Sequence, residues 1–197
     1  MNLCARALSA LAATLLLVSC AALNNINAEI SSYGNWPANR TPGTYGFDRL
    51  PSQQARADAQ QRLEDAAHPA LEAAGFTAAA PGAAPDVLVQ LGARVTRYEQ
   101  SPWDDPLWWR GGFGRWPGRP WIGPHWHGYG GSPRYDREVA LLLRERTSGA
   151  PLYEARATSE GSTSGGDDVL GAMFRAAMAD FPKSGGVPHQ VSVPLKR

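Results

Sequence analysis

Two histidines, His125 and His127, stand in a glycine- and proline-rich stretch and are the first candidates for metal ligands. On a strand, residues i and i+2 point to the same side, so the two imidazoles could share one ion. Asp104 and Asp105 lie upstream, but no third ligand follows at a spacing typical of a metal site. We therefore expect no metal and no cofactor, and His125 and His127 are the residues to test if a metal does bind.

Tryptophan dominates the same stretch. The chain has seven tryptophans, and all but Trp36 lie between Trp103 and Trp126. These side chains must pack on the domain, on each other or on a partner, because they would otherwise expose a large apolar area to water. Tryptophan beside arginine suits the CH faces of sugars, a lipid headgroup layer or a pocket on another protein. The candidate binding residues are Trp103, Trp108, Trp109, Arg110, Arg115, Trp116, Trp121, Trp126 and Tyr129.

Three interpretations of this insert, residues 98–135, remain open. It can be the contact surface for a glycan, a lipid or a protein. It can serve a periplasmic module that binds a small molecule or a metal through His125 and His127. It can also be a self-packed or low-complexity insert without a ligand.

Hydrolytic chemistry is suggested only by a serine cluster around Ser162 and Ser164, next to Asp167 and Asp168. A nucleophile needs a base and an oxyanion donor at hydrogen-bond distance, and the G-x-S-x-G spacing of a nucleophile elbow is absent from this cluster. A loop followed by a helix N-terminus explains these residues, since carboxylates are favourable there. We expect no catalytic residues and no enzymatic activity.

The N-terminus predicts export and lipidation. Arg6 precedes an apolar stretch that is too short to span a bilayer comfortably, which is typical of a signal peptide over residues 1–19. Leu17-Val18-Ser19-Cys20 resembles the lipobox of bacterial lipoproteins, and this resemblance implies that Cys20 becomes acylated after cleavage before it. In lipoproteins of the enterobacterial type, an Asp after the Cys implies retention in the inner membrane. Here Ala21 follows Cys20, so the resemblance implies the outer membrane and a domain that faces the periplasm. Residues 20–42 are interpreted as the lipid anchor and a polar tether.

The charge and the cysteines exclude several classes. Nineteen basic and 18 acidic residues give a net charge of +1, so nothing indicates a nucleic-acid partner. The two cysteines are Cys4 in the signal peptide and the lipidated Cys20, which leaves no free thiol in the mature chain. Disulfide scaffolds and thiolate chemistry are excluded. The expected partners are the membrane, through the lipid, and an envelope glycan or protein.

Secondary-structure patterns place these candidates on a single domain, residues 43–197. Helical spacing runs over 52–74, where Pro69 could divide the helix, and over a second stretch from Asp167 to Pro182. Strands are predicted near 44–47 and 191–195 and, from clear alternation, over 87–95 and in a hairpin of 138–146 with 152–158. The order β-α-β-(long Trp/Gly loop)-β-β-α-β predicts an α+β fold: a largely antiparallel sheet of about five strands with two helices packed on one face. This order also puts the insert and the loop 159–166 at the same end of the sheet.

Several short motifs in this order resemble a known family. They are Thr44-Tyr45-Gly46-Phe47, Gly75-Phe76 after a helix, Pro85-Asp86-Val87-Leu88-Val89, the Gly/Tyr/Trp-rich insert and a final helix ending in Phe181-Pro182. Together they resemble the domain-of-unknown-function 4136 family of predicted bacterial lipoproteins over roughly residues 40–185. The opening of the strand at Asp136 and the residues after the hairpin turn depart from the family pattern. The resemblance implies a cell-envelope location and assigns no catalytic residue.

Overall fold

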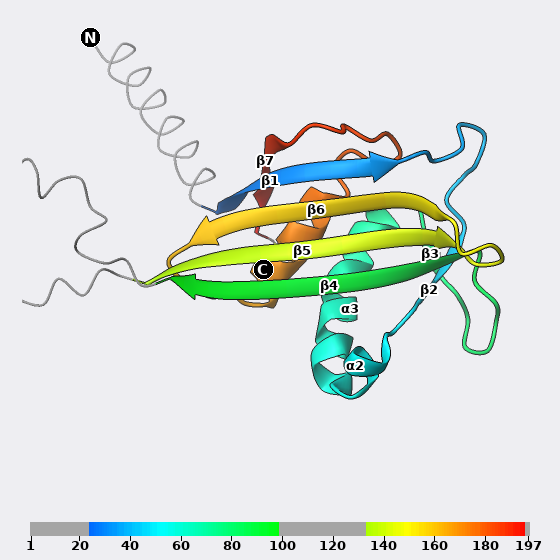
Figure 1. Ribbon diagram of the computed structural model, residues 1–197, viewed down its shortest axis with the longest axis horizontal. Helices are drawn as coiled ribbons and strands as arrows, with labels where there is room; N and C mark the ends of the chain where they lie inside the picture. The colour runs from blue at the N-terminus through cyan, green and yellow to red at the C-terminus, as the bar shows by residue number, and fades with distance from the viewer. Residues whose placement is uncertain (1–23, 99–132, 196–197) are drawn as a thin grey trace, which may run out of the picture.

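The computed structural model describes residues 24–98 and 133–195. These residues form a mixed sheet of seven strands and three helices, in the spatial order β3-β2-β4-β5-β6-β1-β7 (Figure 1). The strands are β1 (Asn25–Gly34), β2 (Thr44–Phe47), β3 (Thr77–Ala78), β4 (Val87–Tyr98), β5 (Arg134–Glu145), β6 (Pro151–Gly161) and β7 (His189–Pro194). The α+β class is confirmed, whereas the predicted number of strands is too small.

The three long strands β4, β5 and β6 form the antiparallel centre of the sheet. Val89 pairs with Leu143, and Leu141 pairs with Ala155, so the inward residues of neighbouring strands meet on one face. Alternation of apolar and polar residues produces this arrangement, since successive side chains point to opposite faces. At the edge of the sheet beside β4, strand β2 runs parallel to both β3 and β4, which makes the sheet mixed.

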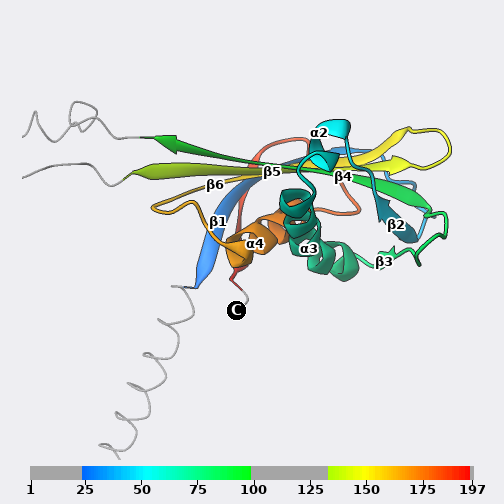
Figure 2. The ribbon, with the colours of Figure 1, turned by 90° about the horizontal axis from the view of Figure 1, so that it is seen from below.

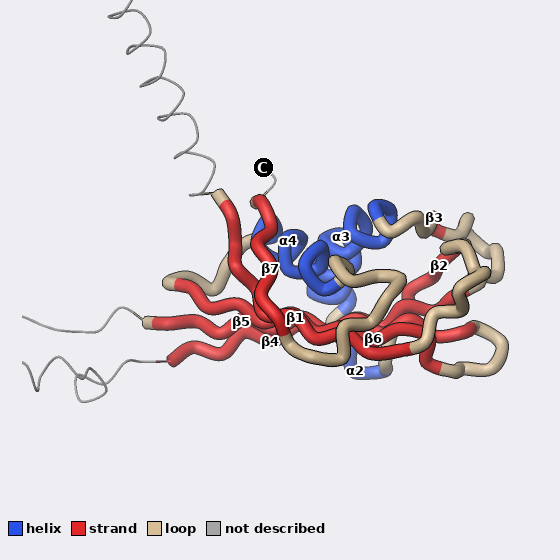
Figure 3. Tube along the Cα trace, turned by 90° about the horizontal axis from the view of Figure 1, so that it is seen from above, coloured by secondary structure: helices blue, strands red, loops and turns tan. Residues whose placement is uncertain are grey.

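Two helices cover one face of this sheet, and a third lies at its edge. The helices are α2 (Pro51–Gln54), α3 (Ala57–Ala73) and α4 (Asp167–Ala177). Figures 2 and 3 show α3 and α4 side by side on one face, with α2 beside the edge of β4. The expected helix 52–74 is divided before Ala57, so the prediction of two helices is wrong. Pro69 lies inside α3 without ending it, and Gly75, at a φ of +93°, follows the last turn as predicted.

Strand β1 corrects the predicted tether. Residues 25–34 form a ten-residue strand between β6 and β7. Its Ile26, Ala28 and Ile30 are buried under the helices, while Asn27 and Glu29 point to the other face. Asparagine and serine suggested a flexible linker, but the alternation of apolar residues between them determines the structure because it lets one face be buried.

An aromatic cluster lies in the core near the C-terminal end of α3. Trp36 packs edge-on against Phe76 and Phe181, with ring centroids 5.5 and 4.9 Å apart, and Phe181 contacts Tyr153 at 5.3 Å. Burial raises the pKa of Tyr153 to about 12, so its hydroxyl keeps its proton and can donate to the carbonyl of Ala177 at 3.3 Å. None of the helices in residues 24–98 and 133–195 has the length and apolar character needed to cross a bilayer.

Gly34, at the end of β1, offers a stability test of the corrected topology. Its φ is +134°, and an added Cβ would lie 2.5 Å from the carbonyl oxygen of Leu152 and 2.8 Å from the Cα of Tyr153. Both obstacles are backbone atoms of β6, which cannot move without disturbing the sheet. We expect Gly34→Ala to lower the free energy of unfolding by about 2 kcal/mol.

Thermal and urea unfolding of the full chain measure this loss. Gly82 is the matched control, because it also has a positive φ of +81° but an added Cβ meets nothing within 4 Å. Gly82→Ala therefore carries the backbone strain without the collision. Equal losses for the two variants would contradict the close packing of β1 on β6.

Candidate functional site

The predicted candidate residues lie mostly outside the described part of the chain. Trp103, Trp108, Trp109, Arg110, Arg115, Trp116, Trp121, Trp126, Tyr129, His125, His127 and the lipidation site Cys20 all fall in residues 1–23 or 99–132. The structure does describe where residues 99–132 begin and end. Tyr98 is the last residue of β4, Arg134 is the first residue of β5, and the two pair directly. The insert therefore emerges at one end of the sheet.

The Ser/Gly loop lies at this same end. Tyr135 of β5 pairs with Gly161, the last residue of β6, and α4 begins at Asp167. The loop 159–166 was expected at the same end of the sheet as the insert. This is confirmed for the described residues on either side of the insert. Ser159, however, is buried, and its hydroxyl donates to the carbonyl of Asn27 at 2.8 Å. Ser159 thus ties β6 to β1.

A polar trough of about 570 Å³ opens near this end of the sheet. Most of its walls come from alternate residues of β4, β5, β6 and β1, whose side chains point away from α3 and α4. The lining residues are Asn27, Glu29, Arg94, Thr96, Tyr98, Asp136, Arg137, Glu138, Thr158, Ser159, Glu160 and Gln190. Its size is that of an ordinary small-molecule site, but its lining is mainly polar.

Several charged side chains at the trough form ion pairs. Glu138 forms ion pairs with Arg94 at 2.9 Å and with Arg156 at 3.8 Å, and Arg134 pairs with Glu160 at 3.2 Å. These exposed pairs contribute little to stability. The lining also holds the carboxylates of Glu29 and Asp136, together with neutral hydroxyl and amide groups. Tyr98, half exposed at the mouth, adds one aromatic face.

Arg137, in the lining of the trough, connects β5 to the end of β6. The sequence did not point to it. It lies on the helix-covered face, is 7% exposed, and donates from Nη2 to the carbonyl of Glu160 at 2.7 Å. Burial lowers the pKa of this guanidinium. An added Cβ on Gly161 would lie 2.0 Å from Nη2, so the glycine makes room for it. The signal in the sequence was an arginine at an inward position of β5, two residues before Val139.

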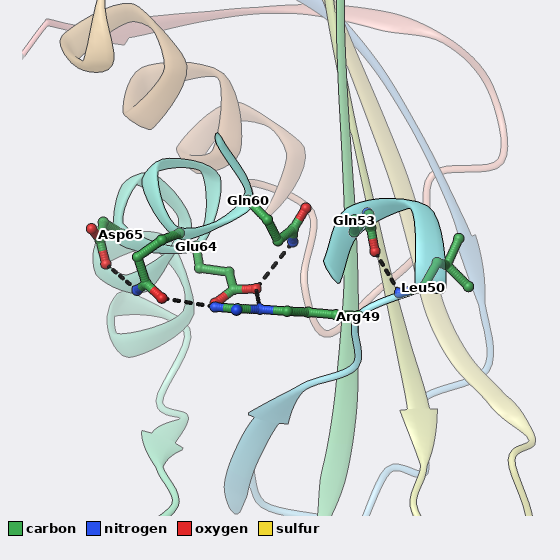
Figure 4. A network of polar contacts seen from close by, with 7 residues as sticks. Arg49, Leu50, Gln53, Gln60, Glu64 and Asp65 are labelled. Atoms are coloured by element: carbon green, nitrogen blue, oxygen red, sulfur yellow. Dashed lines mark hydrogen bonds and ion pairs between the residues drawn. The ribbon is translucent and has the colours of Figure 1, made fainter. Parts of the chain in front are cut away.

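A second polar cluster stands where α2 meets α3. Arg49 reaches Glu64 in a bidentate pair, with Nε at 2.6 Å from Oε1 and Nη2 at 2.5 Å from Oε2 (Figure 4). The side chain of Glu64 is 3% exposed, and Gln60 donates to it at 3.1 Å. The neighbouring Asp65 is exposed and accepts from Gln61 instead. The two carboxylates diverge, as expected for adjacent residues on a helix.

The family motifs contact one another in the structure. The backbone N–H and the hydroxyl of Thr44 donate to the carboxylate of Asp86 at 2.7 and 2.8 Å, and these bonds lower the pKa of Asp86. Phe76 and Phe181 meet in the aromatic cluster. These motifs therefore build the scaffold. Within residues 24–98 and 133–195, no group of three or more His, Cys, Asp or Glu side chains is arranged to hold a metal.

Solved structures show distant likeness to this chain. One is a crystal structure of a PDZ domain protein from Parabacteroides distasonis, at 13% identity and a TM-score of 0.48, covering 89% of this chain and 41% of that one. The chain thus spans less than half the length of that protein. Another is a PelC dodecamer from Paraburkholderia phytofirmans, at 15% identity and a TM-score of 0.42, covering 77% of this chain and 95% of that one.

Sequence comparison gives a firmer result. No curated protein shows a significant match to this chain. A family model does match, over residues 30–183, from within β1 to just beyond the aromatic cluster. The motifs that suggested the family lie within that range, and most of them make the contacts described above. The chain belongs to the family described as Domain of unknown function (DUF4136).

Proposed function

We propose that this chain is a lipid-anchored protein of the bacterial outer membrane, with a non-enzymatic structural or interaction role in the periplasm. The lipobox resemblance at Cys20 supports the anchor. The contact surface is formed by the Trp-rich residues 103–129 together with the polar trough. The observation that carries this proposal is the pairing of Tyr98 with Arg134, because it brings both ends of the insert to the trough that Tyr98 lines.

The chemistry of the trough favours a glycan among the possible partners. Some of its charged side chains are engaged with one another, and Asn27, Thr96, Thr158 and Gln190 add neutral hydroxyl and amide groups that can bond to a ligand. Sugar hydroxyls are complementary to such groups, and aromatic faces suit the CH faces of sugar rings. A lipid surface would instead call for an apolar face or unpaired cations. The proposed ligand class is therefore an uncharged or zwitterionic envelope glycan.

Titration of the full chain with soluble oligomers of N-acetylglucosamine, an uncharged envelope sugar, tests this proposal. In detergent micelles, the oligomers are expected to change the tryptophan fluorescence in a saturable manner. Tyr98→Ala is expected to weaken this binding about tenfold, because it removes the stacking face at the mouth of the trough. Fluorescence titration of the variant measures the shift in Kd.

Tyr33→Ala is the matched control. Tyr33 is 49% exposed and Tyr98 51%, and both lie on the uncovered face of the sheet, but Tyr33 pairs with Glu154 far from the trough. Equal weakening by the two variants would contradict a contact at the trough. A fluorescence response to liposomes alone would assign the surface to lipid, and the absence of any response would remove the insert as a contact surface.

A further inference from the structure

The second half of β4 is an open edge of the sheet. On β4, strand β2 covers only Val87–Val89. Beyond it, the N–H of Asp48 donates to the carbonyl of Val89, and Nε2 of Gln53 donates to the carbonyl of Leu91 at 2.7 Å. Figure 1 shows β4 continuing past β2 as the outermost strand. Among residues 24–98 and 133–195, no strand pairs with this edge after Leu91.

Ala93 and Val95 present their backbone groups at this edge. In an antiparallel pair, alternate residues direct N–H and C=O toward the partner strand and the residues between direct them away. Val89 and Leu91 already bond on the outer side, so Ala93 and Val95, in the same uninterrupted register with β5, also point outward. Their side chains are exposed, Val95 at 51%. An edge with these properties is a template for a further strand.

A groove of about 460 Å³ runs beside this edge. Its walls come from α2, α3, the start of α4 and β4. The residues that give it an apolar floor are Leu50, Ala59, Leu63, Ala93 and Leu170. An extended segment that paired with Ala93 and Val95 would place every second side chain over this floor, since side chains alternate along a strand.

The charges at the rim define the occupant. Arg56 and Arg62 line the groove, are exposed, and have no ion-pair partner in the described part of the chain. Asp167 is the single carboxylate in the lining. A second copy of this chain would bring the same two arginines to the interface, and such like charges repel. An acidic segment is the complementary partner.

We propose that the β4 groove binds an extended segment of a partner protein by strand addition, with apolar residues of that segment facing the floor and acidic residues meeting Arg56 and Arg62. The main-chain bonds to Ala93 and Val95 give affinity, and the arginines give selectivity. This site is separate from the trough, which lies on the opposite face of the sheet, and it does not depend on the insert or on a glycan.

A labelled hexapeptide of alternating glutamate and valine, with both ends blocked, is the probe. Fluorescence anisotropy with the full chain in detergent micelles is expected to show saturable binding. The matched lysine–valine peptide, and a glutamate–valine peptide with alternate backbone amides N-methylated, are each expected to bind at least about tenfold more weakly. Equal affinity for either control peptide, or no binding up to about 1 mM, overturns the proposal.

Two variants locate the binding. Val95→Pro removes an outward N–H from an edge strand, where proline is tolerated, and Arg62→Glu reverses a rim charge. Each is expected to weaken the glutamate–valine peptide about tenfold, whereas Lys183→Glu, an equal change of charge on an exposed residue outside the groove lining, leaves it unchanged. If Val95→Pro unfolds, Arg62→Glu alone decides. An unchanged Kd for Arg62→Glu overturns the proposal. A dimer of this chain that Val95→Pro dissociates also overturns it, and would assign the edge to a second copy.

Discussion

Arg49→Ala is expected to lower the free energy of unfolding by about 3 kcal/mol. The carboxylate of Glu64 is 3% exposed and accepts two hydrogen bonds from Arg49, while Gln60 supplies only one more. Without the guanidinium, a charged group would stay buried with one neutral donor. Breaking a buried pair on one side is costly because the remaining charge is not compensated, even where the intact pair adds little net stability.

Urea unfolding followed by circular dichroism measures this loss, with Arg94→Ala as the matched control. Arg94 also forms an ion pair, with Glu138, but its side chain is 75% exposed, so its loss is expected to cost less than about 1 kcal/mol. The double variant Arg49→Ala/Glu64→Leu is expected to recover most of the stability, since no charge remains buried. A single variant no worse than Arg94→Ala, or a double variant no better than the single, would contradict this account.

The central strands and the last helix could be predicted because apolar residues recur along them, without interruption, at the spacing of a strand or of a helix. Val87, Val89 and Leu91 recur at every second position, and the structure buries all three. The same alternation continues to Ala93 and Val95 and, taken alone, predicts that they are buried as well. Both are exposed, because the helices end before this part of the sheet. Periodicity predicts which face a residue is on, but not whether another element covers that face.

The missed elements were short or were hidden by their composition. Strand β1 carries Asn25, Asn27 and Glu29 at every second position, which lowers its mean hydropathy without breaking the alternation. Strand β3 has only two residues, too few for any pattern. The division between α2 and α3 falls at Ala55 and Arg56, where no glycine or proline marks it. Tertiary packing decides such boundaries, and a single sequence carries little of that information.

The candidate site was predictable in its place but not in its residues. The order of strands put the insert and the Ser/Gly loop at one end, and the pairing of Tyr135 with Gly161 agrees. The trough, in contrast, combines Asn27 of β1 with Thr96 of β4 and Thr158 of β6, residues that are remote in sequence and ordinary in type. Only the register between strands brings them together, and register depends on contacts across the sheet.

Cys20→Ala is expected to abolish lipid modification of the chain. The lipobox resemblance implies that the Cys20 thiol accepts the first acyl groups and that cleavage before Cys20 follows this modification. Each buried methylene of an acyl chain contributes about 0.8 kcal/mol to membrane binding, and stable anchoring requires more than one chain. The variant should therefore lose all label after growth with a palmitate analogue and retain residues 1–19, which a gel or intact mass measures.

Cys4→Ala is the matched control, because Cys4 is the only other cysteine of the chain and lies in the predicted signal peptide. It is expected to leave both the label and the size of the mature protein unchanged. Label that persists in Cys20→Ala, or that disappears in Cys4→Ala, would contradict acylation at Cys20 and with it the proposed anchor. The trough and the β4 groove would stand in either case, because both are built from residues 27–190.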